Sequence, residues 1–334
     1  MGLKAKTHKG HLRVRQKELD LKRKPHQHET READDLVDAE GYVCLPELQT
    51  ISAEVEAELA AFRGDKTSVV ERLEAAIDKR SDLDPTVVQV YTAVGKILAA
   101  YRSGKVPKAF KMIPALEQWE AVLQLTSPSA WTPQAMCEAV SVFVSNMTPP
   151  QAQKFLQSYF LPALRVDIRE HGKLNFHYYA ALKKAIYKPA AWFKGVIFPM
   201  CEDKNTTLRE AAVLGSAVMK VSLPMAHASA ALLRLSTLPY TGPSSFVIKS
   251  LLAKKLALPK RVVSGLQQFF VRARTEERHL PLLWHQLLLT FVQLYAKHLD
   301  VPQRAQLREV LQVQRHALVS PEVERLLETS LELA

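Results

Sequence analysis

The sequence is poor in the residues that build β-sheet folds and small disulfide-bonded folds. Its 334 residues include 11 glycines, three cysteines and only 7% aromatic residues. So few glycines argue against a β-sandwich or barrel, which needs many tight turns. The cysteines, Cys44, Cys137 and Cys201, lie far apart and form no CxxC pair. This spacing excludes a cysteine-rich zinc site and disfavours a disulfide framework.

Targeting and membrane-spanning segments are also missing. No apolar run follows the charged N-terminus, so we expect no signal peptide. The stretch nearest to a membrane span, residues 280–296, carries no formal charge but contains Pro281, His285 and Gln286 and is shorter than the ~20 apolar residues that span a bilayer. We expect a helix there that is buried on all sides, in a soluble intracellular protein. Binding to a membrane surface through the N-terminus is disfavoured, because its bases lack an adjoining apolar face.

Recognisable catalytic motifs are absent. The sequence has no P-loop and no GxGxxG, HExxH or GxSxG motif. Asp167 and His171 lie one turn apart in DIREHG, but a charged helix end running into Gly172 explains this string more simply. His26 and His28 would make a weak metal site at best. We predict no enzymatic activity, no catalytic residues, no cofactor, no metal and no small-molecule substrate.

Positive charge is in clear excess. Lysine and arginine total 45 against 34 aspartate and glutamate, which gives a net charge of +11 and an isoelectric point near 9.5. A protein this basic attracts polyanions, of which nucleic acid is the commonest in a cell. Net charge alone does not separate RNA from an acidic protein or an anionic membrane.

Charge patterning predicts a mobile N-terminal arm over residues 1–50, basic at first and then acidic. KRKP at residues 22–25, with two arginines upstream, is a candidate nuclear import signal. Its cations are Arg13, Arg15, Lys22, Arg23 and Lys24. Helical periodicity begins near Ser52, so we expect linking helices over residues 51–82 and an α-helical domain over residues 83–334.

The rest of the chain reads as helices separated by proline or glycine. Asp84-Pro85 and the capping box TLRE at residues 207–210 are helix-start signals. Strand-like alternation is absent, so we predict an all-α fold. Most breaks are 15 to 22 residues apart, which favours an irregular superhelix of HEAT- or TPR-like helix pairs. No motif repeats at a fixed period, and a compact helical bundle stays open.

One segment combines aromatic residues with unpaired positive charge. In KLNFHYYAALKKAIYKPAAWFKG we expect Asn175 to cap a helix that runs to Lys188, with His177, Ala181, Lys184 and Lys188 in one solvent-facing stripe. Three other clusters also lack acids, and together these clusters indicate a polyanion-binding surface. The candidate RNA contacts are Arg102, Lys105, Lys108, Lys111, Lys173, Lys183, Lys184, Lys188, Lys194, Lys254, Lys255, Lys260, Arg261, Arg272 and Arg274.

Aromatic rings in the same segment raise a second possibility. Tyr187 and Trp192, if exposed, could stack on unpaired bases, which favours RNA with loops over duplex DNA. Core packing is the ordinary alternative for each ring.

Four strings occur in order along the chain: YRSGKVPKAFKMIPAL, LNFHYYAALKKAIYKPAAWFKG, TLREA and LPLLWHQLLLTFVQ. They resemble the bystin family of small ribosomal subunit assembly factors, in a likeness that covers residues 83–331. The resemblance implies a non-enzymatic helical protein that binds the 18S rRNA precursor in pre-40S particles and is needed for small-subunit maturation and pre-rRNA processing. It also implies contacts with small-subunit ribosomal proteins, assembly factors and snoRNA.

The resemblance further implies residence in the nucleolus and nucleus, with export to the cytoplasm on the particle. Bystins usually carry a longer charged N-terminal region, so import and partner functions located there are open for this chain. The family has no catalytic motif, and the choice of RNA contacts rests on charge alone. The alternative is a protein-binding α-helical scaffold whose basic faces meet acidic partners without touching RNA.

Overall fold

The computed structural model describes Val37 and residues 40–43 and 84–332, with side chains up to Thr329. The chain divides into two compact units, Met1–Cys44 and Leu45–Ala334. In the first, Gly41 takes a φ of +86° before strand β1 (Tyr42–Val43), and Val43 forms an antiparallel bridge with Val37. Most of the predicted arm and all of the linking helices lie outside the described residues. The import candidates, Arg13, Arg15, Lys22, Arg23 and Lys24, lie outside them too, so these assignments and the domain boundaries stay predictions.

The described part of the second unit is mostly α-helical, which confirms the predicted fold class. Its one strand, β2, has two residues (Leu174–Asn175). The longer elements are α6 (Pro85–Ala99), α8 (Trp119–Leu125), α9 (Pro133–Asn146), α10 (Pro149–Phe155), α11 (Leu161–His171), α12 (Phe176–Lys184), α15 (Leu208–Lys220), α16 (Met225–Thr237), α17 (Gly242–Ala253), α18 (Lys260–Val271), α19 (Leu282–Tyr295), α20 (Val301–Val313) and α21 (Ser320–Glu332). Short helices α7 (Lys108–Met112), α13 (Pro189–Trp192) and α14 (Phe198–Glu202) lie between them.

Local signals set the helix ends as predicted. The Asp84 carboxylate accepts a hydrogen bond from the Thr86 amide at 2.8 Å and begins α6. Thr207 and Glu210 form the capping box that begins α15. Gly172 ends α11 with a φ of +67°, a left-handed conformation that glycine adopts without steric cost.

Two long helices continue past a proline through a π-helical turn. Residues Leu156–Phe160 form such a turn two residues before Pro162, and Phe193–Ile197 form one two residues before Pro199. A proline inside a helix lacks an N–H and clashes with the carbonyl four residues earlier. The wider turn just before each proline accommodates that loss without breaking the helix.

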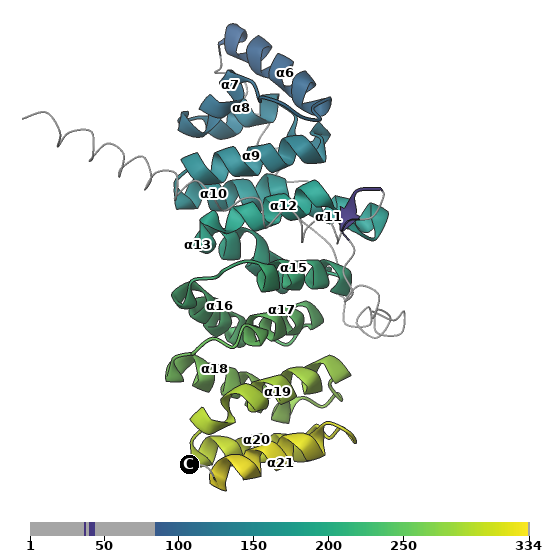
Figure 1. Ribbon diagram of the computed structural model, residues 1–334, viewed down its shortest axis with the longest axis vertical. Helices are drawn as coiled ribbons and strands as arrows, with labels where there is room; N and C mark the ends of the chain where they lie inside the picture. Colours follow the sequence, from purple (N-terminus) through teal and green to yellow (C-terminus); the bar gives the residue numbers. More distant parts are fainter. Residues whose placement is uncertain (1–36, 38–39, 44–83, 333–334) are drawn as a thin grey trace, which may run out of the picture. The chain divides into compact units, whose positions relative to one another are not determined.

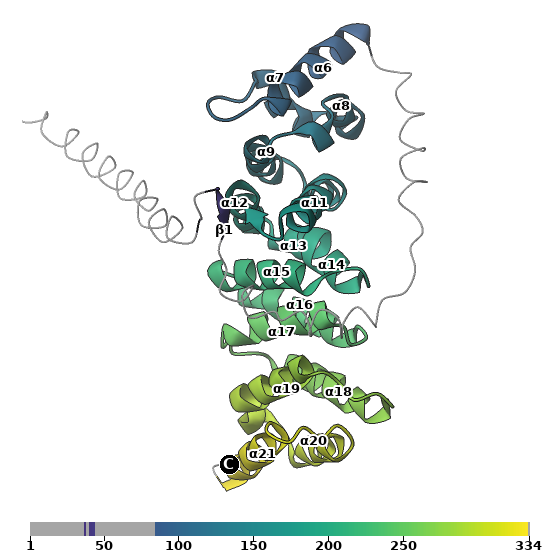
Figure 2. The ribbon, with the colours of Figure 1, turned by 90° about the vertical axis from the view of Figure 1, so that its right-hand side faces the viewer.

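From α15 onward the helices of the second unit stack in two rows (Figures 1 and 2). Helices α15, α17, α19 and α21 pack on one another in one row, and α16, α18 and α20 do so in the other. The first row begins its helices at Leu208, Gly242, Leu282 and Ser320, which are 34, 40 and 38 residues apart. This uneven spacing explains why no motif repeats at a fixed interval in the sequence.

Helices of the same row run parallel, because their C-terminal ends are bonded to each other. The Tyr295 hydroxyl, at the end of α19, donates to the Leu256 carbonyl just beyond α17 at 2.8 Å. Lys254 and Arg272, described below, make equivalent links. The C-termini of one row therefore meet at one edge of the stack.

The predicted all-buried helix is α19, which packs between α17 and α21. Trp284, Leu287 and Phe291 are buried, whereas Leu282 at its first turn is 48% exposed. No helix in the described part of the chain is long and apolar enough to cross a membrane.

Candidate polyanion-binding surface

Helix α12 carries the centre of the predicted basic segment. The Asn175 side chain caps it by accepting from the His177 amide at 2.9 Å, as predicted. The helix ends at Lys184, however, and a 3-10 turn (Ala185–Tyr187) follows. The predicted wet stripe is also too wide, because α12 packs on both α9 and α15 and this leaves Ala181 fully buried.

Lys188 does not face solvent as predicted. Its ammonium donates to the backbone carbonyls of Val144, Ser145 and Met147 at the end of α9. The last carbonyls of a helix have no partner within the helix and carry partial negative charge. Burial lowers the pKa of Lys188. Lys188 therefore closes a helix end and has no free donor for phosphate.

Two other predicted RNA contacts also donate to the last carbonyls of a helix. Lys254, just after α17, donates to the carbonyls of Met219 and Val221 at 3.1 and 2.7 Å and so closes the end of α15. Arg272, just after α18, donates to the carbonyls of Ser236 and Thr237 at the end of α16. They turn inward because parallel stacking brings each of them to the end of the preceding helix in its row. Lys188 likewise follows a helix, α12, that packs on the helix whose end it binds, α9.

Acidic residues distant in the sequence neutralise three further candidates. Lys184 lies 3.7 Å from Glu138, and both side chains are more than one-third exposed. The other pairs are Lys260 with Asp300 at 3.1 Å and Arg274 with Glu309 at 2.6 Å. Each acid lies at least 35 residues from its base, so a local count of charges misses it. Exposed pairs of this kind contribute only about 0–1 kcal/mol, and a phosphate can replace the carboxylate.

Most of the remaining candidates are exposed on the surface. Those whose side chains make no ion pair or hydrogen bond among the described residues are Arg102, Lys105, Lys108, Lys111, Lys194, Lys255 and Arg261. Lys173 is also exposed. Lys183 is half-buried, and its ammonium lies 5.3 Å from the centre of the Tyr179 ring.

Four of these cations lie close together in sequence and form the cationic loop, defined as Arg102, Lys105, Lys108 and Lys111. Two hydrogen bonds fix its start, because the Tyr101 hydroxyl donates to the Gly104 carbonyl at 2.6 Å and the Thr132 hydroxyl donates to the Tyr101 carbonyl at 2.6 Å. Phe110, buried in α7, anchors its end.

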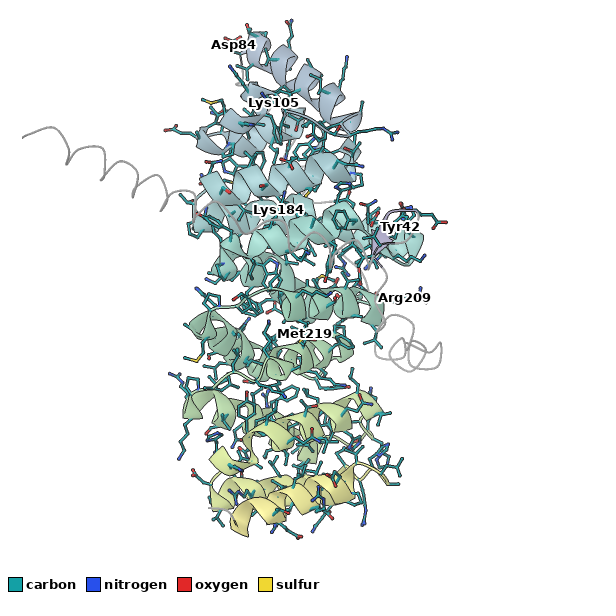
Figure 3. The ribbon with its side chains drawn as sticks, in the orientation of Figure 1. Tyr42, Asp84, Lys105, Lys184, Arg209 and Met219 are labelled. Atoms are coloured by element: carbon teal, nitrogen blue, oxygen red, sulfur yellow. The ribbon has the colours of Figure 1, made fainter. Side chains whose placement is uncertain are left out.

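Helix α9 links the start of the cationic loop to the basic end of α12. Its N-cap residue, Thr132, donates to the Tyr101 carbonyl at 2.6 Å, and its Glu138 pairs with Lys184 at 3.7 Å. Burial raises the pKa of Tyr101, Glu138 raises it further, and Lys184 opposes the rise. Figure 3 shows Lys105 at the level of the first helices and Lys184 on α12, with α9 between them.

The two aromatic candidates differ in solvent exposure. Tyr187 is 71% exposed, whereas Trp192 is fully buried and packs edge-on against Phe193 with ring centres 5.0 Å apart. Trp192 is core because α13 packs on α10. It offers no stacking surface, and only Tyr187 of this pair does.

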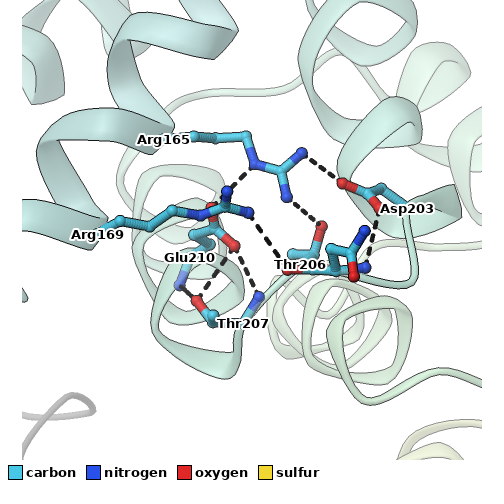
Figure 4. A network of polar contacts seen from close by, with 7 residues as sticks. Arg165, Arg169, Asp203, Thr206, Thr207 and Glu210 are labelled. Atoms are coloured by element: carbon cyan, nitrogen blue, oxygen red, sulfur yellow. Dashed lines mark hydrogen bonds and ion pairs between the residues drawn. The ribbon is translucent and has the colours of Figure 1, made fainter. Parts of the chain in front are cut away.

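Sequence reasoning missed a buried polar network between α11 and the start of α15 (Figure 4). The Glu210 carboxylate has no exposed surface and accepts from Arg165 at 2.9 Å, with Arg169 at 3.3 Å. Arg165 also pairs with Asp203 at 2.5 Å. Burial opposes the charge on Arg165, but Glu210 and Asp203 raise its pKa overall. The TLRE string revealed the cap and not this second role of its glutamate.

No group of three or more His, Cys, Asp or Glu side chains in the described ranges is placed to hold a metal ion. Asp167 of the DIREHG string accepts from the Asn175 amide at 2.7 Å, which ties the end of α11 to the start of α12. This contact supports the structural interpretation of that string.

Fold and surface together define a basic, mostly α-helical protein with an exposed cationic loop. Residues 46–333 match the model of the bystin family, and the chain belongs to this family. Bystins from Homo sapiens and Bos taurus are each 49% identical over 248 residues, which cover 74% of this chain and 57% of each relative. The Arabidopsis thaliana bystin is 44% identical over 257 residues, covering 76% of this chain and 58% of the relative. The chain therefore spans less than two thirds of the length of these relatives.

Proposed function

We propose that this protein acts in ribosome biogenesis as a non-enzymatic scaffold that binds the 18S rRNA precursor in pre-40S particles. Membership of the bystin family, which is not a known enzyme family, supports a role of this kind. Its proposed partners are small-subunit ribosomal proteins, assembly factors and snoRNA. Its proposed location is the nucleolus and nucleus, with export on the particle.

The cationic loop is the observation that carries the proposal. Its four bases are exposed, and no carboxylate neutralises them within the described residues. Each base that meets a phosphate releases a counterion, so binding should weaken steeply with salt. Such contacts position the RNA without reading its sequence.

Stacking of parallel helices in two rows supports a HEAT-like scaffold as the structural part of the proposal. A stack held by side-chain links between helix ends presents its surface residues at fixed spacings, so a bound polyanion meets a pre-arranged set of charges.

The test is the triple charge reversal Lys105→Glu, Lys108→Glu and Lys111→Glu in the full chain. We expect the variant to fold, since these side chains hold no partner among the described residues, and to leave pre-small-subunit particles in a sucrose gradient. A matched control reverses three other exposed bases that have no ion pair within the described ranges, Lys220, Lys297 and Arg315. The loop is a better target than Lys183, Lys184 and Lys188, because reversal at Lys188 would place a carboxylate against backbone carbonyls.

Co-sedimentation of the loop variant at the wild-type level would remove this loop from the binding surface. Ribonuclease treatment separates the rival interpretation, in which basic faces bind acidic proteins. That rival predicts partner binding that survives ribonuclease and no ultraviolet crosslink to RNA, and either result would contradict the proposal.

A further inference from the structure

Tyr187 presents a large aromatic ring to solvent from a fixed backbone position. Its side chain is 71% exposed and makes no hydrogen bond or ring contact among the residues the structure describes. Tyr187 is the last residue of the 3-10 turn Ala185–Tyr187, and Lys188 after it is bonded to three carbonyls at the end of α9. Pro189 then begins α13. The ring is therefore held outward by bonded chain on both sides.

The surroundings of Tyr187 are basic or polar and nearly free of acids. Lys183 and Lys184 lie four and three residues earlier, a spacing that puts them on the neighbouring helix surface. The end of α9, reached through Lys188, offers exposed Ser145 and Asn146. No acid occurs between residues 185 and 201, and Glu138 is the acid that pairs with Lys184.

Covering an exposed tyrosine ring in an interface costs little side-chain entropy, because only two side-chain torsions are fixed. An apolar protein partner would be favoured by a large apolar surround, whereas here two lysines precede the ring and the end of α9 offers exposed Ser145 and Asn146. Positive charge beside an open aromatic face suits a nucleic acid strand with accessible bases.

We propose that Tyr187 is a stacking platform for an unpaired RNA base, with Lys183 and Lys184 contacting the flanking phosphates. This inference rests on the proposed function and narrows its ligand to single-stranded RNA. Every base has an aromatic face, so stacking here tolerates any sequence. A duplex does not satisfy the site, because its bases are already stacked on each other.

The experiment measures binding of the full chain to a fluorescein-labelled oligouridine of about 12 nucleotides, a length within the range of single-strand sites. An RNA duplex of equal length serves as the second probe. Tyr187→Ala should weaken binding of the single strand by roughly five- to 150-fold, the factor expected for one base stack. Tyr187→Phe should keep wild-type affinity, and both variants should bind the duplex like wild type.

Salt dependence gives an independent readout. Since Tyr187→Ala removes no phosphate contact, its slope of log affinity against log salt should equal that of wild type, whereas Lys183→Gln with Lys184→Gln should lower the slope. Leu318→Ala is the control, because it removes another strongly exposed apolar side chain, one that is 84% exposed.

Two results would overturn the proposal, and they are distinguishable. Wild-type binding of oligouridine by Tyr187→Ala, while the triple reversal of the cationic loop weakens binding, would refute stacking and leave the proposed function intact. Failure of the wild-type chain to bind either probe would refute direct RNA binding, and the platform with it.

Discussion

Lys188→Met should destabilise the fold although the residue lies in a basic surface segment. The substitution keeps most of the side-chain length and removes the ammonium that donates to Val144, Ser145 and Met147. The carbonyls at the end of α9, on which the turn Ala185–Tyr187 packs, then lack this donor.

The size of the effect follows from two overlapping contributions. A cation at a helix C-terminus contributes about 0.3–1 kcal/mol, and up to about 2 kcal/mol when partly buried. A hydrogen bond to a charged group contributes about 1.5–3 kcal/mol. The same atoms make both contributions, and water can reach the exposed Ser145, so we expect a loss of about 2 kcal/mol. For a domain of this size that corresponds to a fall in Tm of roughly 4–8 °C.

Thermal unfolding followed by circular dichroism measures the change, with Lys194→Met as the matched control. Lys194 is an exposed lysine of the same segment without a partner among the described residues, and its replacement should stay within about 0.5 kcal/mol of wild type. Equal Tm values for the two variants would refute the capping role and would mean that the Lys188 ammonium is available to a polyanion.

Further predictions concern buried groups. Glu210→Ala leaves two arginines without their buried partner and should cost about 3–5 kcal/mol, whereas Glu309→Ala breaks an exposed pair and should cost about 0–1 kcal/mol; similar Tm shifts for both would contradict this. Burial and then a neighbouring histidine lower the pKa of His285 from 6.5 to about 4, so the unfolded chain takes up the proton first. The stabilising contribution of neutral His285 should therefore be fully present above pH 6.5, and the free energy of unfolding should fall by about 3 kcal/mol as pH drops towards 4. Urea unfolding at a series of pH values should show a smaller fall for His285→Gln than for wild type, whereas the exposed His298→Gln should follow wild type. Burial raises the pKa of Cys201 to about 12, so mass spectrometry should find it alkylated at pH 8 only after denaturation, and labelling of the native protein would argue against this packing.

Helix ends were predictable from sequence because they depend on neighbours within one turn. Asp84, Gly172 and the Thr207–Glu210 box each act on backbone groups two to four residues away. Such local chemistry appears directly in the order of residues, and helices with marked ends sufficed to predict the fold class.

The candidate site was predictable only in part, because pairing between distant residues decides which cations are free. Glu138 reaches Lys184 across the contact between α9 and α12, and nothing in the basic segment itself indicates that acid. Trp192 and Tyr187 lie five residues apart in the same segment, yet one is core and the other is exposed. Only the packing of α13 on α10 distinguishes them.

Parallel stacking also explains which clusters remained open. Every helix ends in carbonyls that need donors, and at α9, α15 and α16 a lysine or arginine that follows a helix packed on it supplies them. At the end of α6 the donor is Thr132, whose amide and hydroxyl both reach the Leu98 carbonyl, at 3.4 and 3.5 Å. Because a neutral threonine closes that end, the bases of the cationic loop are not needed for the fold. A net charge of +11 therefore overstates the surface available to a polyanion, and the loop beside α6 is the predicted cluster whose cations all stay without a partner among the described residues.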